Sequence, residues 1–211
     1  MNLRIILILL ITISLNVTSA ELADTLRMGN QSLMFNFAGA SITPGNFKGG
    51  VGYQFFINKS TAIRLPIGLS YWSSSLPKPD NTESAYSETN YSLSLTPGIR
   101  TDAARGWNII AYYGAELITS YENRDTSGIN NKNQSITSKI YQFGGAIFAG
   151  AEWFPVNSLS LSLEYSLSFV YSSGSTLYKF GTSEQTRDFP STFDIKTGLG
   201  GLGFILTFYF N

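Results

Sequence analysis

Large apolar residues alternate with small polar ones along most of the chain. The clearest example is residues 159–171, "LSLSLEYSLSFVY", in which every second residue is large and apolar. The residues between them, up to Val170, are serine or glutamate. Strict alternation indicates a β-strand with two different faces. The pattern predicts a sheet but leaves open whether its apolar face meets a protein core or lipid.

Alternating segments of this kind recur through the chain, and no amphipathic helix competes with them. We expect eight strands, at 31–39, 48–57, 61–72, 89–101, 107–121, 139–153, 158–171 and 195–210. Short connections, "NKS", "DAARG" and "FPVNS", follow the second, fourth and sixth strands. Longer connections follow the odd-numbered strands: "SITPGNF" and residues 73–88, 122–138 and 172–194. This alternation predicts an all-β, up-and-down antiparallel barrel of the transmembrane kind, with short periplasmic turns and long external loops.

Aromatic residues mark both ends of the apolar faces. Those nearest the long connections are Tyr71, Tyr91, Tyr121, Tyr141 and Tyr171. Those nearest the short connections are Phe55, Trp107, Trp153 and Phe210. Tyrosine and tryptophan gather at membrane interfaces because each combines an apolar body with a polar tip. Two such girdles around a band of leucine and isoleucine favour an apolar face that points outward into lipid.

The amino-acid composition argues against several classes of function for this chain, among them nucleic-acid binding and catalysis. Only 13% of the 211 residues are charged, about half the usual share, and 14 basic residues balance 14 acidic ones. A net charge of zero without basic clusters excludes nucleic acid as an expected partner. The chain has no cysteine and no histidine, so it offers no thiolate chemistry and lacks the usual general base. We expect no enzyme activity and no cofactor or metal.

The first twenty residues have the pattern of a secretory signal. "MNLR" supplies a positive charge, "IILILLITISL" an apolar stretch, and "NVTSA" small residues before a cleavage point after Ala20. The apolar stretch is shorter than the roughly 20 residues that a transmembrane helix needs. We therefore expect a signal peptide at 1–20 and a single barrel domain at 21–211, located in the cell outer membrane.

The segments "GAEWFPVNSLSLSLEYSLSF" and "GLGFILTFYF" resemble the small eight-stranded outer-membrane barrels, the family of OmpX, OmpW and the transmembrane part of OmpA. The resemblance covers residues 31–210 and is architectural. It implies outer-membrane lipid as surroundings, and recognition of the closing strand 195–210 by barrel insertion machinery. The terminal alternation of Phe204, Leu206, Phe208 and Phe210 carries that signal, and Asn211 follows it where family members end on the aromatic residue.

One glycine motif and one set of charges are candidates for chemistry. "GLGGLG" at 198–203 fits a dinucleotide-binding pattern, but a strand rather than a helix follows it, so we read these glycines as structural. Five charged residues fall on the inner face: Arg64, Arg100, Glu116, Glu152 and Glu164. Because an isolated buried charge is unfavourable, we expect Arg64 to meet Glu164 and Arg100 to meet Glu152. The set is either a structural plug or a gated path for ions or protons.

Two functions remain open at this stage. The first is a passive, non-catalytic envelope protein that displays polar loops, with its lumen filled by side chains, as the narrow interior of eight strands suggests. The second is a narrow, porin-like channel for small or apolar solutes, in the manner that resemblance to OmpW implies. The inward-facing Ile110, Tyr112, Ile118 and Phe148 would line it. The sequence names no ligand for the loops.

Overall fold

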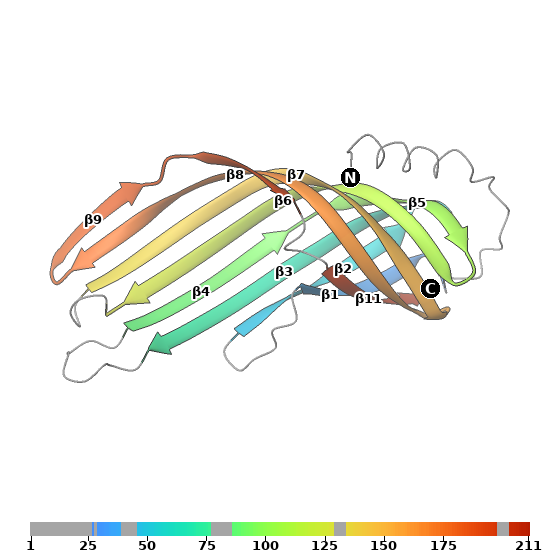
Figure 1. Ribbon diagram of the computed structural model, residues 1–211, viewed down its shortest axis with the longest axis horizontal. Helices are drawn as coiled ribbons and strands as arrows, with labels where there is room; N and C mark the ends of the chain where they lie inside the picture. The colour runs from blue at the N-terminus through green and yellow to red at the C-terminus, as the bar shows by residue number, and fades with distance from the viewer. Residues whose placement is uncertain (1–26, 28, 39–45, 77–85, 129–133, 198–202) are drawn as a thin grey trace, which may run out of the picture.

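The structure is a computed structural model that describes residues 27, 29–38, 46–76, 86–128, 134–197 and 203–211. These residues form one antiparallel sheet of eleven strands (Figure 1). The described part of the chain has no helix long and apolar enough to span a membrane. The expected signal peptide, 1–20, lies outside the described residues. The strands are β1 (Gln31–Ala38), β2 (Asn46–Phe56), β3 (Thr61–Leu76), β4 (Tyr86–Leu95), β5 (Gly98–Gly106), β6 (Ile109–Ser127), β7 (Gln134–Val156), β8 (Leu159–Phe180), β9 (Ser183–Asp188), β10 (Thr192–Thr197) and β11 (Gly203–Phe210).

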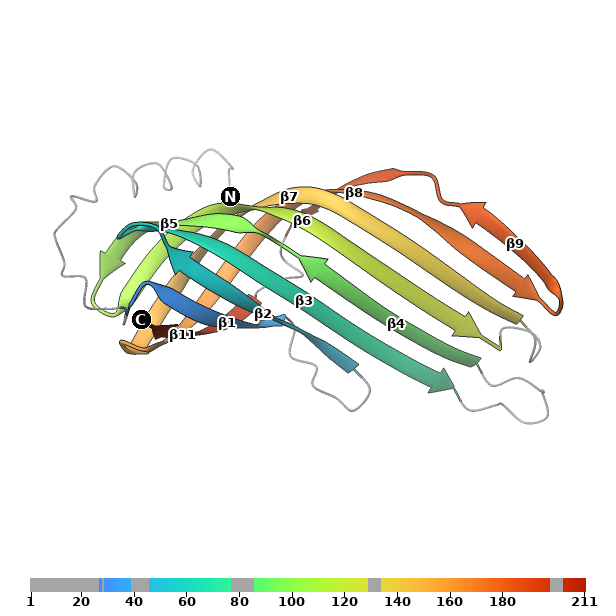
Figure 2. The same ribbon diagram turned by 180° about the vertical axis from the view of Figure 1, so that it is seen from behind.

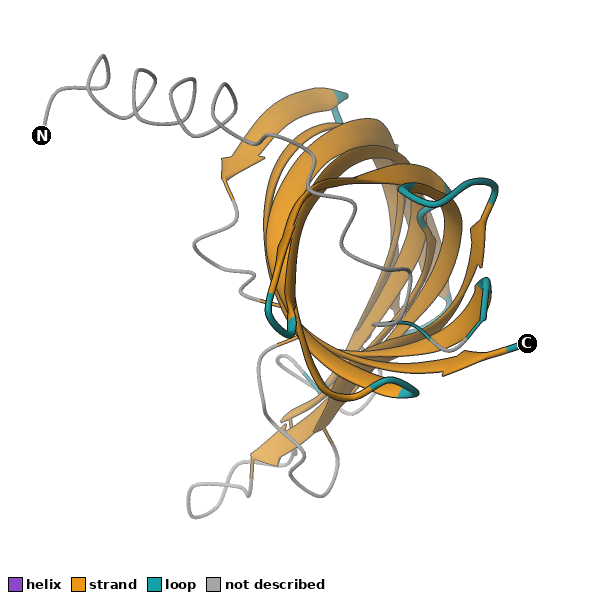
Figure 3. Cartoon of the chain, turned by 90° about the vertical axis from the view of Figure 1, so that its right-hand side faces the viewer, coloured by secondary structure: helices purple, strands orange, loops and turns teal. Residues whose placement is uncertain are grey.

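The sheet closes on itself into a ring. β1 pairs with β2 on one side and with β11 on the other, and β11 in turn pairs with β8. Viewed along its axis, the ring of strands is complete (Figure 3). β4 and β5 occupy one position between β3 and β6, and β10 and β11 both pair with β8, so the ring has eight positions. The expected all-β, antiparallel order of eight is therefore confirmed.

The expected strand 89–101 is interrupted at Thr96 and Pro97. Proline has no N–H to donate to a ladder, so it is unusual inside a sheet. Backbone hydrogen bonds still join these two residues to the neighbouring strands. The amide of Thr96 donates to the carbonyl of Pro66 at 3.0 Å. The amide of Leu117 donates to the carbonyl of Pro97 at 2.9 Å. The interruption divides one ring position into two strands without opening the ring.

The expected long loops are wrong in part, because much of each is strand. β3 continues to Leu76, β6 to Ser127 and β8 to Phe180, while β4 and β7 begin at Tyr86 and Gln134. Together with β9 these segments form an open sheet beyond the ring, the distal extension, which projects to one side in Figures 1 and 2. Residues 77–85 and 129–133 of the expected loops lie outside the described part. Both faces of the distal extension are rich in polar residues, so no apolar alternation marked these strands in the sequence.

At the opposite end of the ring, the turn side, two of the three turns are tighter than expected. "DAARG" lies within β5 and "FPV" within β7, so only residues 107–108 and 157–158 connect these strands to the next. Trp107 therefore lies in a turn, not on the apolar face of a strand. Its φ of 55° is in the left-handed region, and its side chain is 92% exposed. The favoured two-residue hairpin turns have positive φ at their first central residue, which fits this backbone.

The two faces of the ring differ as the alternation predicted. Large apolar side chains on the outer face are exposed, among them Val51, Ile63, Leu65, Leu93, Ile147 and Leu163. The inner face holds the buried residues, both apolar ones such as Ile110 and charged ones such as Arg64. The protein therefore keeps its core inside the ring and presents a largely apolar outer surface.

Candidate functional site: the interior of the ring

Five side chains pack together inside the ring at the turn side, and we call them the turn-side plug. They are Phe56, Ala62, Ile110, Phe154 and Tyr209. They come from five strands, β2, β3, β6, β7 and β11, so five of the eight ring positions contribute. The ring of Tyr209 lies 5.5 Å from that of Phe154 and 6.4 Å from that of Phe56, measured between centroids. Their packing fills the interior at this level.

Glu152 is fully buried beside this plug, at 0% exposure. Its carboxylate accepts hydrogen bonds from Ser160 and from Arg100, and from the hydroxyl of Tyr209 at 2.6 Å. The guanidinium of Arg100 also stacks 3.8 Å from the ring of Tyr112. Because the buried charge has both an opposite charge and two hydroxyl donors, the arrangement meets the conditions under which a buried ion pair is tolerated.

Asp102 joins three arginines at the same end. Its carboxylate forms ion pairs with Arg27, with Arg100 at 3.1 Å and with Arg105 at 3.1 Å. Arg27 precedes β1, and its guanidinium lies 3.8 Å above the ring of Phe56. Arg27 is thus held against the turn-side plug by both charge and cation–π contact. This network closes the turn side of the interior.

A second layer, the middle layer, lies further along the interior. Arg64 forms an ion pair with Glu164 at 2.9 Å, and the hydroxyl of Tyr112 donates to Glu164 at 3.2 Å. The guanidinium of Arg64 lies 4.5 Å from the centroid of Phe148. Strands β3, β6, β7 and β8 supply these residues, so the contacts cross the interior rather than follow one strand.

A cavity of about 250 Å³ lies above the middle layer, toward the distal extension. Arg64, Glu116 and Glu164 are its charged lining residues. The rest of its inner wall is small or polar, and includes Asn36, Gly50, Gly52, Gly68, Ser70, Ser92 and Ser94, with Met34, Pro66 and Ile205 as apolar members. We call it the interior cavity.

The structure brings together four of the five charged residues proposed from the sequence. Arg64 pairs with Glu164 and Arg100 pairs with Glu152, as their heights above the short turns predicted. Glu116 takes no part in these pairs and lies in the wall of the interior cavity. Ile110, Tyr112 and Phe148, suggested as an apolar channel lining, are buried among the packed layers, and Ile118 is half-buried.

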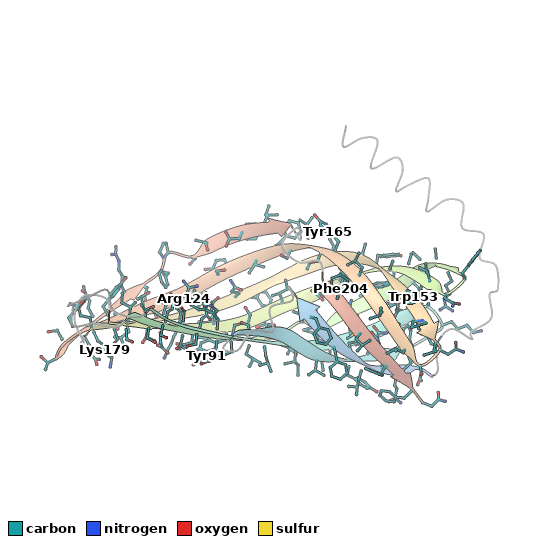
Figure 4. All side chains as sticks on the ribbon, turned by 60° about the horizontal axis from the view of Figure 1, so that its bottom comes forward. Tyr91, Arg124, Trp153, Tyr165, Lys179 and Phe204 are labelled. Atoms are coloured by element: carbon teal, nitrogen blue, oxygen red, sulfur yellow. The ribbon has the colours of Figure 1, made fainter. Side chains whose placement is uncertain are left out.

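The girdle residues lie mostly where the alternation placed them. Tyr71, Tyr91, Tyr141 and Tyr171 are exposed on the outer face, and Tyr121 is half-buried between two neighbours. Its ring lies 6.2 Å from that of Tyr91 and 5.2 Å from that of Tyr141. At the turn side Phe55 and Trp153 are exposed and Phe210 is half-buried. In Figure 4 Trp153 lies at the turn side, Tyr91 between the two ends and Lys179 near the tip of the distal extension.

Sequence reasoning missed several members of the turn-side network. Asp102 was expected in a turn, and Arg27, Ser160 and Tyr209 were not singled out from the sequence. A signal existed for three of them, because Asp102 lies two residues from Arg100, and Ser160 and Tyr209 fall on the inner face by alternation. Arg27 lies outside any alternating segment, so nothing in the sequence pattern predicted its contact with Asp102 and Phe56.

The glycine motif and a metal site are two further candidates for chemistry. Of the "GLGGLG" motif only Gly203 is described, at the start of β11. Within the described ranges, no group of three or more acidic residues, histidines or cysteines could hold a metal ion. No protein-family model matches the chain, and no curated protein matches it.

Proposed function

We propose that the protein is an integral outer-membrane β-barrel, a non-catalytic envelope protein whose interior is plugged and whose polar distal extension faces the outside of the cell. The observation that carries this is the exposed apolar outer face. Leu65, Leu93, Ile147 and Leu163 come from four different positions of the ring, and each is 43–56% exposed. Soluble monomers rarely expose a contiguous apolar surface of this extent.

The backbone hydrogen bonding of the ring also supports a lipid environment. A strand surrounded by lipid must have every N–H and C=O bonded within the protein, which only a closed ring achieves. β1 and β11 complete the ring by pairing along eight residues, from Gln31 opposite Phe210 to Ala38 opposite Gly203. No free edge interrupts the apolar band along these eight residue pairs, so this part of the ring suits a hydrocarbon environment. Further along the same ring position, β10 pairs with β8 alone among the described strands.

The distal extension supports surface display. Its strands carry polar and charged pairs, including Lys179 with Glu184 at 2.7 Å and Arg124 with Glu88 at 3.4 Å. Asn90 also donates to Glu122 at 2.7 Å. Charged groups at this density are unfavourable in hydrocarbon, so the extension belongs in water. Phe204 and Phe208 of β11 lie exposed on the outer face, and the closing strand is the proposed contact with the insertion machinery.

The alternative, a narrow channel for small or apolar solutes, has less support. Its suggested lining residues Ile110 and Phe148 are at most 4% exposed and pack into the interior. The turn-side plug and the Glu152 network lie across the path that a solute would take. A channel would require these layers to move apart.

The protein from Glu21 onward is expected to fold in detergent or lipid to a β-rich form that migrates differently on gels before and after boiling. A closed barrel satisfies its backbone internally and resists unfolding by cold sodium dodecyl sulfate. Circular dichroism and heated and unheated gel lanes measure this. A chain that dissolves as a folded monomer in buffer without detergent would contradict the membrane assignment.

The refolded protein is expected to show no steady conductance in a planar lipid bilayer, because packed side chains fill the interior at two levels. The control is the same lipid with buffer and detergent alone. Stable unitary currents that change when Glu164 is replaced by glutamine would favour the channel instead, since Glu164 lies in the middle layer.

A further inference from the structure

The interior cavity is a blind pocket. Its lining along β3 runs from Arg64 at the middle layer to Ser70 toward the distal extension. The middle layer, to which Arg64 belongs, and then the turn-side plug lie on the turn side of the cavity. These layers close the cavity at that end. At about 250 Å³ it lies just below the size range of typical ligand pockets, roughly 300–1,000 Å³. Such a volume suits a small molecule.

Glycines on the inner wall make this space. A Cβ on Gly68 would lie 2.3 Å from Oγ of Ser94, and one on Gly52 would lie 2.8 Å from Cε of Met34. Both are closer than side chains approach one another, so larger residues here would force their neighbours to move. The width of the cavity therefore depends on residues without side chains at the positions that face it.

Polar atoms around the cavity have unused hydrogen-bonding capacity. Nε of Arg64 and Oδ1 of Asn36 are buried without a partner among the described residues. Arg64 is only 4% exposed. Buried polar groups are normally bonded. Oδ1 of Asn36 is an acceptor, so it suits a guest that donates hydrogen bonds, whereas Nε of Arg64 is itself a donor.

The charges of the side chains that line the cavity indicate which class of small molecule it can bind. The described lining has two carboxylates and one guanidinium, and Arg64 is already paired with Glu164. Among the described residues no cation lies within ion-pair distance of the remaining carboxylate, that of Glu116. A carboxylate in such a partly enclosed site is stabilised by an opposite charge. An anion would be repelled by the two carboxylates, and a neutral sugar would add no positive charge to that of Arg64, which interacts with both carboxylates.

We propose that the interior cavity binds a small organic cation with a primary ammonium group, anchored by Glu116. The serine hydroxyls and Asn36 accept further hydrogen bonds, and Met34, Pro66 and Ile205 contact the carbon chain. The inference deepens the proposed function, on which it rests, by giving the plugged barrel a binding site that is reached from the side of the distal extension.

The test uses 1,4-diaminobutane, with 1,4-butanediol as its neutral counterpart. Isothermal titration calorimetry on the full mature protein in zwitterionic phosphocholine micelles should show saturable binding of one diamine and no binding of the diol. Replacing Glu116 by glutamine should weaken diamine binding by at least about tenfold, since a hydrogen bond to a charged group contributes about 1.5–3 kcal/mol.

Two further variants separate the site from general effects. Glu184→Gln removes the same charge from β9, in the distal extension, and should bind like the wild type. Ser94→Leu keeps all charges but fills the cavity beside Gly68, and should abolish binding. The boiled and unboiled gel lanes show whether each variant is folded.

Three results would overturn the inference: no saturable diamine binding by folded wild-type protein, equal binding of the diol, or unchanged binding by folded Glu116→Gln. None of them bears on the membrane assignment, because the gel shift and the need for detergent test that separately. A protein that shows the gel shift but binds no diamine keeps the proposed barrel and loses only this site.

Discussion

Replacing Glu152 by leucine is expected to lower the free energy of unfolding by about 3 to 5 kcal/mol, the usual effect of removing one partner from a buried ion pair. Glu152 is fully buried and holds Arg100, Ser160 and Tyr209. Its loss leaves the Arg100 guanidinium with Asp102 alone as an acidic partner and leaves two hydroxyls without their acceptor. Denaturant titration in phosphocholine vesicles, followed by tryptophan fluorescence, measures the change.

The double variant Arg100→Met with Glu152→Leu should be more stable than the Glu152→Leu single variant. Removing Glu152 alone leaves buried Arg100 with only Asp102, a carboxylate that it shares with Arg27 and Arg105, whereas removing both Arg100 and Glu152 eliminates that under-compensated cation. The two effects are therefore not additive. As a surface control, Lys179→Met and Glu184→Leu should each change stability by less than about 1 kcal/mol, because exposed ion pairs contribute little. Small additive effects at positions 100 and 152 would mean that the turn side is hydrated and open.

Replacing Leu93 by arginine should impair folding into bilayers, by less than the roughly 2 to 4 kcal/mol expected at the midplane because the girdle residue Tyr91 is two residues away. Replacing its neighbour Ser94 by arginine should be tolerated better. Leu93 is 50% exposed on the outer face, and Ser94 lines the interior cavity near two carboxylates. The two positions belong to one strand at the same height and differ only in face. Folding yield into vesicles of defined lipid, measured by gel shift, compares them.

An equal penalty at the two positions, or the reverse order, would mean that the outer face does not meet lipid. Leu163 and Ser162 form a similar pair of opposite faces on β8, but there the inner position makes a poor control. Ser162 is only 4% exposed and lies opposite Glu152 and Ile205 in the sheet register. An arginine there would be overpacked for reasons unrelated to lipid. The cavity makes β4 the better strand for the test.

Most of the ring could be predicted because each of its strands has two chemically different faces. The alternation in 159–171 placed Leu161 and Leu163 outside and Ser160 inside, as the structure shows. Counting from the short turns also predicted which arginine meets which glutamate, since strand rise is nearly constant. The strands of the distal extension were not predicted, because both faces of the extension are rich in polar residues. Its strands therefore carry no apolar alternation.

The sequence by itself determined the strand order, the inner and outer faces and the two cross-ring ion pairs, because these depend on period and on height along a strand. Only the tertiary structure decided what fills the interior. Closure of the ring brings Phe56, Phe154 and Tyr209 into contact from strands far apart in sequence, and gives Asp102 three arginines. It also leaves a cavity where glycines face inward. Such contacts depend on the stagger between strands around the closed ring, which no single strand's pattern encodes.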